Sequence, residues 1–410
     1  MTELRVDHDR LWQSLMTMAE IGATANGGVD RQTLTHLDKE GRDLFRRWCE
    51  DAGLVVTVDR MGSMFARRTG TDDGLPPVML GSHLDSQPTG GKFDGALGVL
   101  AALEVIRTLN DQGIQTRHPL EIVNWTNEEG CRFPPAMIAS GVFARVFDLD
   151  YGLSRTDHQG RTIGEELERI GYAGDAPVGG RAIHGLFEVH IEQGPILEAE
   201  GKRIGVVTGG QGARWYDAAV IGSETHAGPA PMESRRDALM HAAAMLAPIY
   251  ETATTRRPHG RATVGEFIAR PGSRNTVPGR VDFTIDIRHP DGAVLDEMHA
   301  ELERAFDEAK QRTGLDNRLN CIWHSPPVEF DGACVDAVQG AAEELGLSSM
   351  RMVSGAGHDA VYMARVVPTA MIFVPCRDGI SHNEAEYASP EACGDGADVL
   401  LHAALARAGR

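Results

Sequence analysis

Short apolar runs alternate with helical patterns along much of this chain, and that alternation limits the folds it can adopt. The runs at 78–81, 120–125 and 186–191 are too short for helices, and we predict that they form buried strands. Between the first two, residues 96–109 repeat leucine and isoleucine at helical spacing. Strands that alternate with helices build a largely parallel sheet covered by helices. We therefore expect an α/β fold with a mixed, largely parallel sheet.

The middle of the chain has a different pattern. Its expected order of elements is β-α-β-β-α-β, the ferredoxin-like split arrangement, from 215–222, 235–250, 261–268, 280–289, 293–313 and 319–323. We therefore expect an inserted α+β domain at 213–326, with 1–212 and 327–410 forming one discontinuous metal-binding catalytic domain. Glycines at 208–212 and the prolines at 326–327 mark the junctions. The other predicted elements are helices at 8–24, 35–52, 333–345 and 390–407 and a strand at 370–375.

Charge and composition exclude several classes of partner. The 410 residues carry a formal charge of −19, whereas binding to nucleic acid or an anionic membrane needs clustered lysine and arginine. The six cysteines are scattered without a Cys-x-x-Cys pair, which argues against a zinc ribbon and favours a reducing compartment. We see no leader pattern and no run of about 18 apolar residues. We therefore expect a cytoplasmic protein of about two or three domains without a membrane span.

The glycine-rich segment 81–95, GSHLDSQPTGGKFDG, follows a predicted strand and contains two residues that commonly bind metals, His83 and Asp94. Ligands gather at the carboxyl ends of strands in such sheets. We expect Asp85 to hold the second imidazole nitrogen of His83, because residues two apart in extended chain point the same way. His83 could instead be a core histidine, and Asp94 could cap the following helix. A carboxylate at position 94 could also bridge two metals about 3.5–4 Å apart.

Two adjacent carboxylates, Glu128 and Glu129, follow the predicted strand 120–125 and precede Gly130. Such pairs are common on protein surfaces, but at a buried strand end they can divide the work of a hydrolase. Only one of the two can face an ion squarely. We assign Glu129 as a metal ligand and Glu128 as the general base, because proton abstraction needs a carboxylate near the metal that the metal does not saturate.

The segment FEVHIEQG contains the next candidate ligand, His190. Strand periodicity places Glu188, His190 and Glu192 on one face, and a polar row on a central strand is costly unless it is used. An exposed edge strand is the alternative. His382, in SHNEAE, is a weak signal alone. It completes a set of five candidate metal ligands, namely His83, Asp94, Glu129, His190 and His382.

Three polar residues of the expected inserted domain are further candidates. His226 lies too far along the fold to be a direct metal ligand, but it could donate a hydrogen bond to an oxyanion. Asn275 and Arg288 lie in segments with strand-like alternation. Periodicity alone favours a solvated face for Arg288. A substrate carboxylate would give this arginine a use, because a guanidinium group binds carboxylates through two parallel hydrogen bonds.

Together these segments resemble the M20-type metallopeptidase and amidohydrolase superfamily, and within it the hydantoinase/carbamoylase branch. That branch contains N-carbamoyl-L-amino acid hydrolases, β-ureidopropionases and allantoate amidohydrolases. The run HIEQGP distinguishes it from the M20 dipeptidases. The motifs follow family order along nearly the whole chain: GSHLDSQPTGGKFDGALGVLAALEVI, NEEGCRF, HIEQGP, HAG, NTVPG, DIR, SGAGHDA and SHNEAE.

The resemblance implies two divalent cations per subunit, with zinc favoured over manganese, cobalt or nickel. The five candidate ligands match the family's ligand positions, with Asp94 at the bridging position and Glu128 at that of the general base. The resemblance also implies a homodimer formed through the inserted domain, which would serve as a lid. In that dimer His226 would act in the partner's site.

The residues that would contact the substrate also follow from the resemblance. Gln193, Asn275 and Arg288 match family positions that hold the substrate. One departure is the run Pro-Ala-Pro at 229–231, where the family often has small hydroxyl residues, and it leaves the contacts of that loop open. His358, in SGAGHDA, matches a family loop near the site but receives no role.

We therefore expect a metal-dependent amidohydrolase that acts on a small ureido compound with a carboxylate. The expected reaction cleaves the ureido C–N bond of an N-carbamoyl-L-amino acid or of N-carbamoyl-β-alanine, giving an amino acid, ammonia and carbon dioxide. An allantoate amidohydrolase and a peptidase or deacylase are the alternatives within the superfamily. A binding protein on the same scaffold would be expected to lack Glu128 or a ligand, and none of these is missing here.

Overall fold

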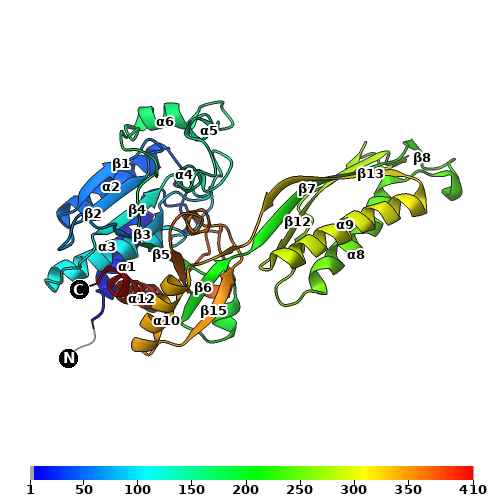
Figure 1. The fold of residues 1–410 in the computed structure, drawn as a ribbon. Coiled ribbons are helices and arrows are strands. Elements are labelled where there is room, and N and C mark those ends of the chain that lie inside the picture. The colour runs from blue at the N-terminus through cyan, green and yellow to red at the C-terminus, as the bar shows by residue number, and fades with distance from the viewer. Residues whose placement is uncertain (1–3, 410) are drawn as a thin grey trace. The chain divides into compact units, whose positions relative to one another are not determined.

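The computed structural model describes residues 4–409 and separates into two compact units (Figure 1). Unit 1 combines Met1–Gly209 with Glu329–Arg410, and unit 2 is Gly210–Val328. Within the described range, no helix is long and apolar enough to cross a membrane.

A nine-stranded mixed sheet forms the centre of unit 1. Its strands are β1 (Val55–Val58), β2 (Met64–Arg68), β3 (Val78–His83), β4 (Leu120–Trp125), β5 (Gly185–Ile191), β6 (Ile204–Gly210), β14 (Val328–Glu329), β15 (Ser349–Ser354) and β16 (Thr369–Val374). The order is β1-β2-β4-β3-β5-β16-β6-β14, with β15 paired to β6. The central strands β4, β3, β5 and β16 are mutually parallel, and β2 and β6 flank them in antiparallel pairing.

Helices pack against this sheet and bury its central strands. They are α1 (His8–Glu20), α2 (His36–Asp51), α3 (Ala96–Asp111), α4 (Ile138–Phe143), α5 (Leu149–Leu153), α6 (Ile163–Ile170), α7 (Ile196–Ala199), α10 (Gly332–Glu344), α11 (Asp359–Met363) and α12 (Pro390–Ala408). Every residue of β3, β4, β5 and β16 is buried, as expected for parallel strands covered by helices. The predicted α/β fold with a largely parallel sheet is confirmed.

The first helix is shorter than its sequence pattern predicts. The pattern runs over 8–24, whereas α1 ends at Glu20 because Ile21 takes an extended conformation. Gly22 then turns the chain with a φ of 86°, a region that favours glycine.

Unit 2 contains a five-stranded antiparallel sheet with two long helices. Its elements are β7 (Gly212–Ile221), β8 (Thr225–His226), α8 (Ala238–Thr254), β9 (Arg261–Thr263), β10 (Phe267–Arg270), β11 (Thr276–Val277), β12 (Arg280–His289), α9 (Gly292–Thr313) and β13 (Asp316–Ser325). The sheet order is β10-β12-β7-β13, with β9 also paired to β12. When β9 and β10 are counted as one interrupted strand, the long elements follow the order β-α-β-β-α-β.

The core of unit 2 lies between its sheet and helices α8 and α9. Alternate residues of β12 point into this core, from Val281 to Ile287, together with Met245 of α8 and Leu302 of α9. The intervening residues of β12, including Asp286 and Arg288, are partly exposed on the other face of the sheet. The alternation of β12 therefore determines which face receives the helices.

Candidate active site

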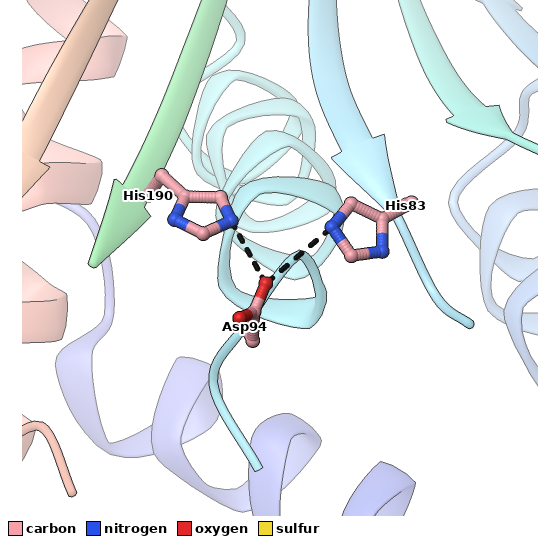
Figure 2. Close-up of side chains that lie close together, drawn as sticks. All are labelled: His83, Asp94 and His190. Carbon is pink, nitrogen blue, oxygen red and sulfur yellow. Dashed lines mark ion pairs between the residues drawn. The ribbon is translucent and has the colours of Figure 1, made fainter. Parts of the chain in front are cut away.

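The ligand-type residues of unit 1 come together at the carboxyl ends of its parallel strands. His83 ends β3, and His190 is the penultimate residue of β5. Asp94 comes from the loop before α3, and Figure 2 shows its carboxylate between the two imidazole rings. Glu129 follows β4, and His382 follows β16. Neighbouring parallel strands thus deliver these side chains to one edge of the sheet.

The two carboxylate oxygens of Asp94 face different ligand-type residues. Oδ1 lies 3.1 Å from Nε2 of His190 and 3.5 Å from Nε2 of His83. Oδ2 lies 3.5 Å from Nε2 of His382, and that nitrogen lies 3.3 Å from Oε2 of Glu129. The result is two groups of potential metal ligands that share Asp94, and within each group the ligand atoms lie within 4.8 Å of one another. We call His83, Asp94 and His190 the first group, and Asp94, Glu129 and His382 the second group.

The two buried histidines present the ring nitrogen that a cation needs. Nδ1 of His83 contacts the carbonyl oxygen of Asp85 at 2.9 Å, and Nδ1 of His190 contacts that of Ile191 at 2.9 Å. These contacts place the proton on Nδ1 and leave the lone pair of Nε2 on the side of Asp94, although Nε2 of His190 also accepts a hydrogen bond from the backbone N–H of Gly95 at 3.2 Å. Nε2 of His83 is buried and has no hydrogen-bond partner among residues 4–409. A lone pair that faces a carboxylate needs a cation or a proton between them, so the first group fits a metal ion.

The electrostatics of the pocket also favour a cation. Burial and the neighbouring Asp94 raise the pKa of Glu129 to about 8, and burial raises the pKa of Glu128 well above its ordinary value. Burial alone would also raise the pKa of Asp94, but His190 and His83 outweigh it and hold that pKa well below its usual range. Several buried carboxylates at one place are costly without positive charge. Bound cations would offset that cost.

Asp94 does not act as the cap of α3. The N-cap residue is Gly95, and in the described chain no side chain caps this helix start. Gly95 has a φ of 64°, and a Cβ there would overlap the imidazole ring of His83. The alternative of a simple helix cap at Asp94 is therefore wrong, and glycine at 95 lets the loop approach His83.

Asp85 plays a different part from the one predicted. Its carboxylate lies 3.8 Å from Nδ1 of His83, and that nitrogen bonds instead to the backbone carbonyl of Asp85. The carboxylate accepts hydrogen bonds from the backbone N–H groups of Glu128 and Glu129, each at 3.3 Å. Asp85 therefore connects the loop after β3 to the loop after β4, and it orients the two glutamates rather than the histidine.

The adjacent glutamates point to different places. Glu129 belongs to the second group, and Gln87 holds it through its backbone N–H at 3.1 Å and its side-chain amide at 2.7 Å. Glu128 lies outside both groups, with Oε2 3.5 Å from Nε2 of His83. The side chain of Glu128 is thus close to the candidate cation positions without being one of the grouped ligands.

The polar row on β5 is buried, so the alternative of an exposed edge strand is wrong. β5 lies between β3 and β16. Glu188 accepts a hydrogen bond from Ser82 at 2.6 Å, and Glu192 accepts two backbone hydrogen bonds at the start of α7, each at 2.8 Å. Glu188 and Glu192 therefore each accept hydrogen bonds, and the donors are not the groups to which His190 bonds.

His358 packs against His190, with the ring centroids 4.5 Å apart in an edge-to-face arrangement. Glu188, His190 and His358 form another group of potential ligands. However, Nδ1 of His190 bonds to a carbonyl oxygen, so His190 has one lone pair to offer, and that lone pair lies toward Asp94 and the backbone N–H of Gly95. Burial lowers the pKa of His358 well below its ordinary value, so this ring stays neutral.

Two further residues contact Asp94, and sequence reasoning did not assign either to it. Gln193 donates from Nε2 to Oδ2 of Asp94 at 2.8 Å, whereas the resemblance had implied contact with the substrate. Ser381 lies 2.9 Å from the same oxygen. Ser381 could have been found from the sequence, because it directly precedes the candidate ligand His382.

The candidate residues of unit 2 fall into two places. His226 on β8 pairs in register with Thr276 of β11, next to Asn275, whose carbonyl oxygen accepts a hydrogen bond from Ala227 at 2.8 Å. Arg288 pairs with Asp286 through its guanidinium group at 2.7–3.0 Å.

These two places lie at opposite ends of β12. Gly279, directly before the first residue of β12, bonds to Gly222, which follows β7 and leads toward His226. Arg288 is eight residues along β12 from Arg280, which is roughly 26 Å at about 3.3 Å per residue. Within unit 2, the structure therefore brings His226 and Asn275 together and keeps Arg288 apart from them.

Comparison with known proteins agrees with this architecture. The sequence profile of peptidase family M20/M25/M40 matches residues 79–406. An N-carbamoyl-L-amino-acid amidohydrolase of Rhizobium meliloti is 54% identical over 401 residues, covering 98% of this chain and 96% of that protein. An allantoate amidohydrolase of Bacillus subtilis is 33% identical over 374 residues, or 91% of each chain. An amidase of the hydantoinase/carbamoylase family from Burkholderia multivorans superposes with a TM-score of 0.96 at 59% identity, covering 99% of this chain and 98% of that one.

The chain belongs to peptidase family M20/M25/M40, a family of hydrolases, and unit 1 holds two groups of potential metal ligands that suit such an enzyme. Within that family it is a member of the hydantoinase/carbamoylase branch. It is an amidohydrolase, an enzyme that acts on C–N bonds other than peptide bonds.

Proposed function

We propose that this enzyme hydrolyses the ureido C–N bond of an N-carbamoyl amino acid and releases an amino acid, ammonia and carbon dioxide. The substrate would be an N-carbamoyl-L-amino acid or N-carbamoyl-β-alanine. The observation that carries the proposal is the sharing of Asp94 between two groups of ligands at the end of the parallel sheet. The name of the relative from Rhizobium meliloti supports the choice of substrate class.

Two divalent cations would be held per subunit, one by each group, with Asp94 bridging them. Histidine nitrogens and carboxylate oxygens suit zinc, and manganese, cobalt or nickel also accept this set. When bound, such cations polarise a carbonyl group and lower the pKa of water.

Glu128 would be the general base. Its carboxylate accepts a proton from the attacking water and returns that proton to the leaving nitrogen as the C–N bond breaks. Its place outside both ligand groups, 3.5 Å from Nε2 of His83, supports this role. A base in such a position remains free to gain and lose a proton.

Residues of unit 2 would complete the site. We assign His226 to stabilise the oxyanion that forms on the substrate carbonyl. Arg288 would bind the substrate carboxylate with Asn275 and with Gln193 of unit 1. Arg280, at the end of β12 nearer to His226, lies roughly 26 Å along the strand from Arg288, which is too far for His226 and Arg288 to contact one small substrate from the same copy of unit 2. This distance supports an arrangement in which His226 and Asn275 serve the partner's site.

A homodimer through the inserted domain at 213–326 would supply that partner copy. Helix α8 supports this proposal, because it exposes large apolar side chains on unit 2. Met240 is 66% exposed, Leu246 36% and Tyr250 63%. Apolar surface of this kind is typical of a face that a second protein covers, and we propose that the second protein is another copy of this chain.

Allantoate is the second candidate substrate. The similarity to an allantoate amidohydrolase of Bacillus subtilis favours it, and allantoate also combines ureido groups with a carboxylate. The same groups of unit 1 would serve either reaction, so the difference must come from contacts with the rest of the substrate.

One experiment separates these possibilities. Cation content per subunit is measured together with ammonia release from N-carbamoyl-L- and D-amino acids, N-carbamoyl-β-alanine and allantoate, with dipeptides as a further substrate. The expected result is two cations per subunit and the highest kcat/KM on an N-carbamoyl-L-amino acid or N-carbamoyl-β-alanine. A preference for allantoate or dipeptides would overturn the proposed substrate.

A further inference from the structure

A buried carboxylate that the proposed mechanism does not use, Glu386, contacts the loop that carries Asp94. Glu386 is only 4% exposed. Its Oε1 accepts hydrogen bonds from the backbone N–H groups of Phe93 at 3.0 Å and Asp94 at 3.1 Å. Its Oε2 accepts one from the hydroxyl group of Ser381 at 3.0 Å. A buried carboxylate with this many donors fixes the segments that supply them.

The contact with Ser381 extends this arrangement to the second group of ligands. Oγ of Ser381 lies 2.9 Å from Oδ2 of Asp94, and Nε2 of Gln193 donates to both oxygens, at 3.1 Å and 2.8 Å. The next residue is His382, whose Nε2 lies 3.5 Å from that same Oδ2. Glu386 therefore connects the segment of His382 to the loop of Asp94.

The loop fits closely around Glu386. A Cβ at Gly91 would overlap the carboxyl group of Glu386. Only glycine at this position lets the carboxylate reach the N–H groups of Phe93 and Asp94. Substitution of Gly91 should therefore displace Glu386 without removing it.

We propose that Glu386 is a positioning residue for the cation of the second group, which Asp94, Glu129 and His382 form. This inference rests on the two-cation site proposed above. Glu386 acts by fixing Oδ2 of Asp94 relative to the ring of His382. The first group depends less on it, because backbone carbonyl groups orient the rings of His83 and His190 independently. Outer partners of metal ligands typically contribute about 10–100-fold in metal affinity.

Titration of the metal-free full-length protein with Co²⁺ tests the proposal, with heat and the visible absorption of the bound ion as readouts. The unaltered protein is expected to show two binding steps, and the step that His382→Ala abolishes belongs to the second group. Glu386→Ala should weaken that step by about 10–100-fold and weaken the other step, which also uses Asp94, by a much smaller factor. Gly91→Ala should have the same selective effect.

Two further variants separate positioning from general damage. Glu386→Gln should retain most of the affinity, because its amide oxygen still accepts from Phe93 and Asp94 and its amide nitrogen can donate to Ser381. Glu384→Ala is the matched control on the same segment, since Glu384 accepts hydrogen bonds from Thr24 and Asn26 instead. This control should keep both steps.

The results that overturn the proposal are distinct. An unchanged second step in Glu386→Ala, an equal weakening of both steps, or an equal loss in Glu384→Ala would each remove the role of Glu386. A loss in Glu386→Gln as large as in the alanine variant would do the same. A single step in the unaltered protein would instead overturn the two-cation site, and this inference with it.

Discussion

Replacing Glu128 by glutamine tests the division of labour between the two adjacent glutamates. The amide keeps the volume of a side chain that is 7% exposed, but it cannot accept a proton at neutral pH. Glu128 lies outside both ligand groups, whereas Glu129 is part of the second group. The Glu128→Gln variant should therefore fold, retain its cations and lose most of its turnover.

The size of the effect follows from the role. A positioned general base contributes typically about 10²–10⁴ in rate, which corresponds to about 3–5 kcal/mol of activation free energy at 1.36 kcal/mol per factor of ten. We expect kcat to fall by about that factor. KM should change little, because Glu128 is not assigned to substrate binding. The assay is ammonia release from an N-carbamoyl-L-amino acid, with cation content measured on the same samples.

Two variants make the result interpretable. Glu129→Gln should lose a cation and activity together, because it removes a ligand of the second group. Glu200→Gln removes a charge at an exposed position of the same unit and should change neither quantity. Undiminished turnover in Glu128→Gln would refute the assignment of the base. Loss of a cation in that variant would show that Glu128 is a ligand.

Three further predictions concern the loop, the stability of unit 1 and the surface of unit 2. Gly95→Ala should lower cation affinity, measured by titration, because the new Cβ overlaps the ring of His83; unaltered affinity would contradict the need for glycine there. The guanidinium group of Arg169, together with those of neighbouring arginines, lowers the pKa of Glu166 to about 2 from its ordinary value of 4.5. A depressed carboxyl pKa stabilises the fold above pH 4.5, and the contribution is lost as pH falls toward 2. Glu166→Gln should thus lower the free energy of unfolding by about 1–2 kcal/mol at pH 7, less than the full pKa shift corresponds to, because Arg161 and Arg169 are partly exposed and solvent screens their charge. Urea unfolding should show the difference from the unaltered protein narrowing below pH 4.5, and a difference independent of pH would argue against the ion pair. Tyr250→Glu should convert dimers to monomers in analytical ultracentrifugation, and unchanged dimers would exclude this face of α8.

Sequence periodicity located the side chains that lie at strand ends. His83, Glu129 and His190 could be expected at one edge because alternating strands and helices make neighbouring strands parallel, with their carboxyl ends together. Periodicity does not resolve distances of an ångström, however. It could not tell that Nδ1 of His83 bonds to the backbone of Asp85 at 2.9 Å rather than to its carboxylate at 3.8 Å.

The sequence pattern could not predict contacts between loops that lie far apart in the sequence. Glu386 and Phe93 are 293 residues apart, and no repeating pattern indicates that these loops meet. The interruption of the strand predicted at 261–268 was missed for a related reason. That segment alternates as one strand, but its two halves pair with different parts of β12, and Gly265 lies in the break.

Because His226 and Arg288 lie toward opposite ends of β12, variants at these two positions should complement each other when their subunits are mixed. If each site takes Arg288 from its own chain and His226 from the neighbour, then His226→Ala and Arg288→Ala homodimers are both inactive. A hybrid dimer of the two would contain one site with both defects and one site with neither. When the two inactive preparations exchange subunits, each hybrid dimer would therefore have half the turnover of an unaltered dimer. A site built from one chain cannot produce this complementation.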